Sequence, residues 1–494
     1  MEPAKQPVVR SLPDDTPEQP DQHACTVSIA ADRRLDGRRP WDVPPEHPSL
    51  HVLHLPWAIR LGLRLVRDSP TLKRLMWPRT ERRSSRRRIH ILALTLSAVL
   101  VALAALPASG ALSVFVLDGA GGTSGRTIHA IGPDTANAVY AGNLWVFYRD
   151  STAGNLRVGR RTDSWRFFTL DGAGGPNGRV DANVGSYVAA ARYGGALHVF
   201  YSNDGTGDLR HGWYDGAAWH FQTLDGGGGL GGRLDAAVGS GISTTTFGGA
   251  LYVSYVDRTH IDVRLARFNG SSWSFQTLDG AGGLGGRVDG DVGYNTRAAV
   301  FDGHLHVFSF FLDPFVEPDL GERIFGTVRQ ATRSGTGWTV RNVADINCCF
   351  DRQSLAVTRV TDDSVFLFFQ NFGVKSINLR YREWNGVAWI SETPNAMVED
   401  AGFEFEDIGT GASAVTFDGR PFVYYHGFGN PFIPDGVRQA AWNGSSWDMV
   451  TLGVDFGHPT SSRVVGSRRI VFIGDATIPA NRLGAHDLVQ ARGT

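Results

Sequence analysis

The stretch Trp219–Asp235, WHFQTLDGGGGLGGRLD, occurs twice more in the chain with few changes. Trp165–Asp181 reads WRFFTLDGAGGPNGRVD and Trp273–Asp289 reads WSFQTLDGAGGLGGRVD, so the copies begin 54 residues apart. A period of this length is typical of repeat proteins in which each repeat is one supersecondary unit. The 61 Gly, 13 Trp and 28 Phe of the chain fit short strands joined by tight turns.

A second pattern, a short and mostly apolar strand, recurs seven times. The copies are LWVFY (Leu144–Tyr148), LHVFY (Leu197–Tyr201), LYVSY (Leu251–Tyr255), LHVFS (Leu305–Ser309), VFLFF (Val365–Phe369), FVYY (Phe422–Tyr425) and IVFI (Ile470–Ile473). The first six are each followed by a strand containing an arginine and then by a Trp-led strand. The seventh has no Trp-led strand after it, whereas LSVFVLDGAGG (Leu112–Gly122) matches the Trp-led copies but precedes all seven units.

This offset predicts that the first strand completes the last sheet, which closes a ring without exposed edges. Residues 112–494 are therefore predicted to be all-β and to form a seven-bladed β-propeller closed by the N-terminal strand, with an open β-solenoid as the alternative. The LDGxGGxxGRxD motif becomes the crossover between blades, with glycines at its sharp turns and the neighbouring Trp and Phe packed between blades. Two copies also match G-x-G-x-x-G, but no helix pattern follows, which argues against a dinucleotide site.

Residues 1–88 are predicted to be a disordered, basic tail, with Met76 as an alternative start. Residues 89–111 contain an apolar run (91–106) that is short for a membrane helix and is followed by the small residues Ser109 and Ala111. We expect a signal peptide or a retained transmembrane anchor. Because the basic flank stays inside, both place residues 112–494 outside the cell, secreted or anchored at the surface.

The remainder of the chain is acidic, which argues against a nucleic-acid partner. Residues 1–90 hold 17 basic and 11 acidic residues, which leaves 31 and 38 of the totals of 48 and 49 for residues 91–494. Nucleic-acid binding depends on Lys and Arg that neutralise phosphates. Membrane contact is expected only through residues 89–111.

No catalytic, metal or cofactor motif is recognisable, so we predict no catalytic residues, no metal and no cofactor. Glu404–Asp407 (EFED) is either an acid/base carboxylate pair or a solvated strand edge. Cys348 and Cys349 form either a strained vicinal disulfide or two thiols. Units four and six carry insertions between their second and third strands, at 310–326 and 426–436, which suggest a contact surface.

One arginine recurs in the middle of the third strand of six units. We interpret these residues either as structural ion-pair partners or as donors at clefts between blades, where a guanidinium suits sugar hydroxyls or a carboxylate. Nearby aromatic residues could stack on a sugar, and are otherwise core residues. The candidate ligand-binding residues are Arg157, Arg210, Arg264, Arg329, Arg380, Arg438, His211, Trp213, Tyr201 and Tyr255.

The segment LHVFYSNDGTGDLRHGWYDGAAWHFQTLDG (Leu197–Gly226) resembles the repeat of the bacterial seven-bladed propeller lectins and, more distantly, that of the six-bladed fucose-specific lectins. The likeness extends over residues 112–494 at the level of strands and is close in the first three units. Its most specific element, L-x-H-x-W, occurs once, at residues 209–213. In the six-bladed family an Arg, a Glu and an aromatic residue hold the sugar, whereas the matching positions here carry His198 and His211.

The resemblance implies a carbohydrate-binding propeller whose partners are glycans or glycoconjugates. We therefore predict an exported, lectin-like, non-catalytic protein with several sites between blades. Two alternatives remain open, a propeller-fold glycosidase of the sialidase type and an extracellular scaffold for protein interactions. An enzyme predicts one polar pocket on the axis with perturbed carboxylates.

Overall fold

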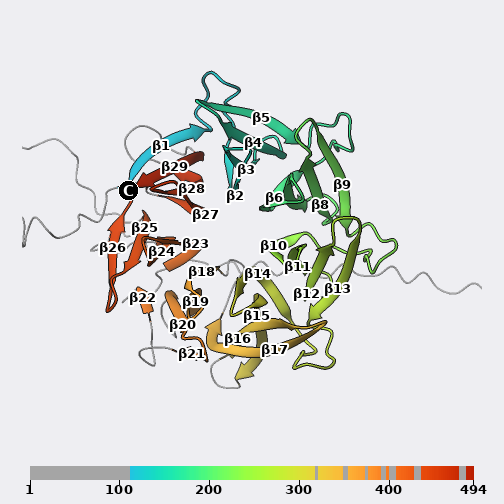
Figure 1. The fold of residues 1–494 in the computed structure, drawn as a ribbon, viewed down its shortest axis with the longest axis vertical. Helices are drawn as coiled ribbons and strands as arrows, with labels where there is room; N and C mark the ends of the chain where they lie inside the picture. Colours follow the sequence, from blue (N-terminus) through green and yellow to red (C-terminus); the bar gives the residue numbers. More distant parts are fainter. Residues whose placement is uncertain are drawn as a thin grey trace, which may run out of the picture. The chain divides into compact units, whose positions relative to one another are not determined.

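The computed structural model of the protein describes residues 112–317, 321–348, 354–372, 377–390, 397–399, 408–427, 436–454, 456–477 and 486–493. These residues form seven antiparallel sheets in which, apart from β1 and β22, strands that follow one another in the chain lie side by side. The sheets are arranged as blades around a ring, with the first strand of each blade innermost (Figure 1). The predicted seven-bladed β-propeller is therefore confirmed.

Each blade has four main strands, and the Trp-led strand of the repeated sequence is the last and outermost of them. Blade one holds β2 (Ile131–Tyr140), β3 (Asn143–Asp150), β4 (Asn155–Arg161) and β5 (Trp165–Asp171), and blade two holds β6 (Val184–Tyr193), β7 (Ala196–Asn203), β8 (Leu209–Tyr214) and β9 (Trp219–Asp225). Blade three holds β10 (Ser240–Phe247), β11 (Ala250–Asp257), β12 (Asp262–Phe268) and β13 (Trp273–Asp279), and blade four holds β14 (Val292–Phe301), β15 (His304–Glu317), β16 (Gly321–Ser334) and β17 (Gly337–Cys348).

Blades five to seven complete the ring. Blade five holds β18 (Leu355–Thr361), β19 (Ser364–Phe372), β20 (Ile377–Trp384), β21 (Trp389–Ile390) and β22 (Met397–Glu399). Blade six holds β23 (Ile408–Phe417), β24 (Arg420–Gly427), β25 (Gly436–Trp442) and β26 (Trp447–Thr451). Blade seven holds β27 (Phe456–Val465), β28 (Arg468–Thr477), β29 (Asp487–Gly493) and, as its outer strand, β1 (Ser113–Asp118).

Strand pairing and inner-strand contacts both close the ring. Neighbouring inner strands touch in the order β2, β6, β10, β14, β18, β23 and β27, and β27 touches β2 again. β1 pairs with β29, with Ser113 opposite Arg492 and Phe115 opposite Gln490. In Figure 1 the blue strand β1 lies beside the red strand β29. The closure that the offset of the repeat predicts is confirmed.

Neighbouring blades pack through apolar layers, because alternate side chains of a strand point to opposite faces of its sheet. Phe147 of blade one and Val199 of blade two are fully buried in one such layer. Trp219 of blade two packs on this layer and meets Phe147 edge to face, with 6.0 Å between ring centroids. The aromatic residues of the repeated motif thus pack between blades, as predicted.

The crossovers depend on glycine and aspartate at fixed places in LDGxGGxxGRxD. Asp171 Oδ1 accepts hydrogen bonds from the backbone N–H of Gly172 at 2.9 Å and of Val180 at 2.8 Å, which fixes both ends of the loop. Gly178 has a φ of 81°, and a Cβ there would lie 2.2 Å from the carbonyl oxygen of Phe221. Only glycine tolerates both this backbone conformation and this close approach.

Several predictions lie outside the described residues, namely those for residues 1–111, for Cys349 and for Glu404–Asp407. The insertion of blade six lies largely in residues 428–435, which are also outside. That of blade four lengthens β15 and β16 into a hairpin in which Glu317 pairs with Gly321. Within the described ranges, no helix is long and apolar enough to cross a membrane.

Candidate functional site

Five of the six candidate arginines bind an acidic side chain of the preceding blade. Arg210 Nη2 donates to Asp171 Oδ2 at 3.0 Å, and Tyr201 donates its hydroxyl hydrogen to the same oxygen at 2.5 Å. The other four pairs are Arg157–Asp118, Arg264–Asp225, Arg329–Asp279 and Arg438–Glu399. All of these arginines and acids are buried. A buried carboxylate needs such a partner because an uncompensated buried charge is very costly.

Further donors of these arginines also bond inside the protein. Arg210 Nη2 donates to the carbonyl oxygen of Gly178 at 2.8 Å, which ties the blade to its crossover loop. Burial and the neighbouring Asp171 raise the pKa of Tyr201 well above its usual range, so the phenol remains a donor. Tyr255 makes the corresponding bond to Asp225 at 2.6 Å. This geometry favours the structural interpretation of the arginines, and their ligand-binding role stays a prediction.

Blades four, five and seven depart from this tyrosine–acid–arginine unit, whereas blade six keeps it, with Tyr425 and Arg438 both bonded to Glu399. In blade four Ser309 takes the tyrosine position, while Arg329 keeps its partner Asp279. Between blades four and five, Ala344 takes the acid position, and Phe369, opposite Arg380, takes the tyrosine position. In blade seven the positions of the tyrosine and the arginine hold Ile473 and Val489, which pack in an apolar cluster with Val454.

This pattern of replacement indicates a structural unit. A buried ion pair can be exchanged for apolar residues without loss of stability, provided that all its members change together. Blade seven has made that exchange. Blade five has made only part of the exchange. It keeps Arg380, but the positions that hold the tyrosine and the acid in other blades are apolar.

His211 and Trp213, the lectin-like residues of blade two, belong to a stacked core. The neutral side chains form one hydrogen-bonded series: His198 Nε2 lies 3.2 Å from the carbonyl oxygen of Tyr193, and His198 Nδ1 lies 2.9 Å from His211 Nε2. Gln222 Nε2 lies 3.1 Å from His211 Nδ1. If His198 donates to the carbonyl, each nitrogen finds a complementary partner only when both imidazoles are neutral.

Burial lowers the pKa of His211 well below its usual range, and the neighbouring His198 lowers it further. The His211 ring is sandwiched between Phe200, at a centroid distance of 4.7 Å, and Trp213, at 5.1 Å. His211 is buried and Trp213 is half-buried. His211 is therefore placed as a core residue, and Trp213 packs against it at the margin of the core.

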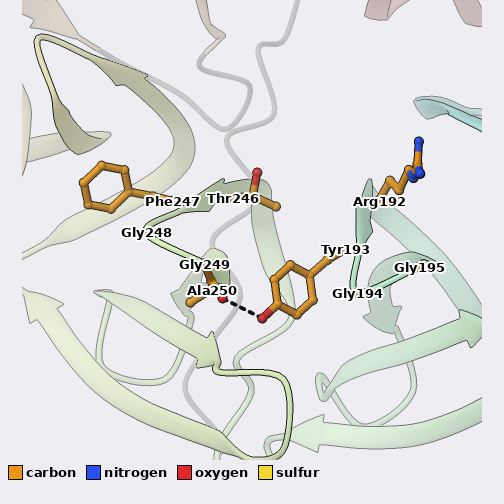
Figure 2. Close-up of a pocket in the computed structure, with 9 residues that line it drawn as sticks. All are labelled: Arg192, Tyr193, Gly194, Gly195, Thr246, Phe247, Gly248, Gly249 and Ala250. Atoms are coloured by element: carbon orange, nitrogen blue, oxygen red, sulfur yellow. Dashed lines mark hydrogen bonds between the residues drawn. The ribbon is translucent and has the colours of Figure 1, made fainter.

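An open hollow lies where the β6–β7 and β10–β11 turns of blades two and three meet (Figure 2). Its walls include Arg192, Tyr193 and Phe247. The Tyr193 hydroxyl donates to the carbonyl oxygen of Gly249 at 2.7 Å, shown as a dashed line in Figure 2. Tyr140 makes the same bond to Gly195 one blade earlier. This tyrosine bond therefore joins neighbouring blades at more than one place in the ring. Because it is a repeated structural contact, it does not mark the hollow as a binding site.

A different polar cluster forms at the centre of the ring, near the beginning of the inner strands. Asp134 of β2 accepts a hydrogen bond from the backbone N–H of Tyr187 of β6 at 2.9 Å. The carboxylate also interacts electrostatically with Arg297 of β14. Since β2 and β14 belong to blades one and four, which are not neighbours, this attraction acts across the centre of the ring.

Two more charged residues border this group. Arg149 lies 3.4 Å from Asp204, and Arg149 Nη1 donates to Ser186 Oγ at 2.8 Å. Burial raises the pKa of Asp134, and the nearby Asp204 adds to this effect. Burial also raises the pKa of Asp204, although Arg149 opposes the shift. We call Asp134, Arg149, Tyr187, Asp204 and Arg297 the axial cluster.

Tyr187 holds an unusual backbone conformation with a φ of 54°. The equivalent positions of blades three and six are Gly241, with a φ of 55°, and Gly411, with a φ of 60°. Left-handed geometry costs a residue with a side chain about 1–2 kcal/mol, and such strain is concentrated at functional sites. Tyr187 is 38% exposed, so burial does not explain why a tyrosine is kept there.

Sequence reasoning missed the axial cluster entirely. None of its members belongs to the repeated motif, although Asp134 and Tyr187 occupy equivalent positions of the inner strands β2 and β6. The one signal was an alignment of the inner strands, in which Tyr187 stands where blades three and six have glycine. In the part of the chain that is described, no group of three or more His, Cys, Asp or Glu side chains is arranged to hold a metal ion.

Comparison with known proteins gives structural similarity only. No family model matches the chain, and no curated protein matches it. The chain is similar to a puromycin-hydrolysing peptidase of Mycobacterium tuberculosis, with 14% identity and a TM-score of 0.44 over 70% of this chain and 49% of the other. It thus spans about half the length of that peptidase.

Two other solved structures resemble it at a comparable level. The Hadza microbial sialidase Hz136 has 12% identity and a TM-score of 0.40 over 71% of this chain and 76% of the other. The β-propeller domain of the trilobed protease of Pyrococcus furiosus has 8% identity and a TM-score of 0.39 over 73% and 92%. Similarities at this level assign no function to the chain, since one fold hosts many functions.

Proposed function

We propose that this propeller is an exported carbohydrate-binding protein whose ligand occupies the axial cluster. The observation that carries the proposal is the convergence of Asp134, Tyr187 and Arg297 from three blades, with Tyr187 held in a strained conformation. A carboxylate accepts hydrogen bonds from sugar hydroxyls, a guanidinium donates them, and an exposed phenol ring covers an apolar sugar face. Unlike sites between blades, this arrangement predicts one ligand per chain.

A glycosidase is the second candidate, favoured by one specific observation. Asp134 and Asp204 belong to the same cluster, and burial raises the pKa of both. A carboxyl group whose pKa is raised is a candidate general acid, and a neighbouring carboxylate is a candidate base. On this alternative the ligand would be cleaved after binding.

The test begins with a glycan array on the full chain, followed by calorimetry with the best ligand. Asp134→Asn and Tyr187→Gly should each weaken binding roughly tenfold to a hundredfold, the effect of losing one charged or one well-placed contact. Tyr187→Gly should leave the melting temperature unchanged or raised, because glycine accepts a φ of 54° without strain. The matched control is Arg192→Ala, an exposed arginine of the same inner strand β6.

Stoichiometry and product release separate the outcomes. One equivalent of ligand per chain, lost in both variants, supports the axial site. Several equivalents that survive both substitutions would favour sites between blades. Release of reducing sugar by the wild-type chain, abolished in Asp134→Asn, would establish the glycosidase in place of the binding protein.

A further inference from the structure

Two arginines meet on one tyrosine where blade three packs against blade four. Tyr252 of β11 is 2% exposed, and its hydroxyl oxygen accepts a hydrogen bond from Arg267 Nε of β12 at 3.2 Å. Arg333 Nη1 of β16 donates to the same oxygen. The Arg333 guanidinium carbon also lies 5.2 Å from the centroid of the Tyr252 ring. Because both guanidinium groups donate to a single atom, two positive charges are held next to each other on half-buried side chains.

No negative charge of the described part of the chain compensates this pair. Within those ranges, neither Arg267 nor Arg333 forms an ion pair with a carboxylate. The hydroxyl hydrogen of Tyr252 also has no acceptor there, since its oxygen takes part only as the acceptor of the two arginine bonds. Like charges repel, so an anion that binds beside both guanidinium groups would stabilise them.

The repeat shows that the packing of the blades does not require Arg333. This residue occupies the strand position that holds Tyr214 in blade two and Trp442 in blade six. Tyr214 packs on Trp145 of blade one, with 5.8 Å between ring centroids, and Trp442 packs on Phe366 of blade five at 6.4 Å. Blade four thus places a charge where these blades place an aromatic ring against the preceding blade.

The donors that remain suit a phosphate group. Arg267 keeps Nη1 and Nη2 without a protein partner, and Arg333 keeps Nη2, while its Nε donates to the carbonyl oxygen of Gly335 at 3.3 Å. None of these unused nitrogen atoms is cut off from solvent. A phosphate monoester carries about two negative charges near pH 7 and three acceptor oxygens, which match two guanidinium groups and one hydroxyl. A carboxylate brings a single charge, so it would leave one guanidinium uncompensated.

We infer that Arg267, Arg333 and Tyr252 form a binding site for a phosphate group that carries two negative charges. The group is free inorganic phosphate or the monoester of a larger molecule, since both present the same oxygens. Each arginine binds it through N–H donors of one planar guanidinium, and Tyr252 donates its hydroxyl hydrogen. The site lies between two blades and shares no residue with the axial cluster, so the inference does not rest on the proposed function.

Calorimetry of the full chain at low salt, where charges are screened least, tests the site with inorganic phosphate, methyl phosphate and acetate. Phosphate should bind at least tenfold more tightly than acetate. Tighter binding of inorganic phosphate than of methyl phosphate identifies the free ion as the ligand, and equal or tighter binding of methyl phosphate identifies an ester of a larger molecule. Acetate that binds as tightly as phosphate, or a chain that binds neither phosphate compound, would overturn the inference.

Substitutions decide where the phosphate binds. Arg267→Gln and Arg333→Gln should each weaken phosphate binding roughly tenfold to a hundredfold, the effect of losing one charged hydrogen-bonding partner. The matched control is Arg160→Gln, because Arg160 has the strand position of Arg267 in blade one and lies 5.0 Å from the centroid of the Trp145 ring. Arg333→Trp keeps the test valid if a glutamine variant unfolds, since the repeat accepts an aromatic residue at that position. Phosphate binding that keeps its full strength in Arg333→Trp would contradict the site.

Discussion

At the scale of single residues, the recurring arginine illustrates what a repeat does and does not reveal. Its residue type and spacing were visible in the sequence, but its partner lies in the preceding blade. Arg157, Arg210 and Arg264 each bind an aspartate 39 residues earlier in the chain. The tyrosine that shares this aspartate lies 30 residues after it in all three cases. These constant separations were available in the sequence, and they would have indicated a structural unit.

Arg210→Ala is expected to destabilise the propeller by about 3–5 kcal/mol, because it leaves the fully buried Asp171 without its counter-ion. Urea unfolding measures this difference. Arg192→Ala, the loss of an exposed arginine in the same blade, should change stability by no more than about 0.5 kcal/mol. An Arg210→Ala chain that melts like the wild type but binds less glycan would restore the ligand-binding role of this arginine.

At the scale of elements, strands and crossovers were predictable because their signals are local. The alternation of apolar residues identifies a strand, and glycines such as Gly178 identify a turn whose geometry no other residue tolerates. Hydrogen-bond networks between strands were not predictable. His306 of β15, for example, is bonded to Gln330 of β16 and lies against Phe301 of β14, residues that only the sheet register brings together.

The His306 network predicts acid sensitivity. Burial lowers the pKa of His306 from 6.5 to about 4, with the charges of His304 and Arg341 acting in the same direction. Above pH 6.5 both the folded and the unfolded chain carry a neutral imidazole, so this group contributes nothing. Between pH 6.5 and 4 only the unfolded chain takes up the proton, and stability falls by about 3 kcal/mol in total.

Urea midpoints measured from pH 7 down to pH 4 in the wild type and in His306→Gln test this expectation. The wild type should lose more stability than the variant over that interval, since the variant lacks the titrating group. Parallel curves would mean that His306 is protonated in the folded chain as readily as in the unfolded one.

At the scale of the whole molecule, the ring could be predicted and the axial cluster could not. Counting the repeats gave the number of blades, and the displaced first strand gave the closure. Asp134, Tyr187 and Arg297 do not repeat, and they approach one another only because seven blades close around one axis. A property that arises from closure leaves no local trace in the sequence, except where it imposes strain, as at Tyr187.

Closure itself gives the last prediction. Deletion of Leu112–Asp118 removes β1, which pairs with β29 and contributes Val114 and Val116 to the apolar layer between blades six and seven. It also removes Asp118, which leaves the buried Arg157 without its carboxylate partner. Losing the outer strand and a buried counter-ion together should lower the free energy of unfolding by well over about 3–5 kcal/mol, the cost of breaking a buried ion pair alone. Calorimetry should therefore find a large fall in melting temperature, or a chain that aggregates through the exposed edge of β29. The matched control is deletion of residues 1–90, which supplies no strand to any of the seven described sheets, and an equal effect of the two deletions would contradict closure by β1.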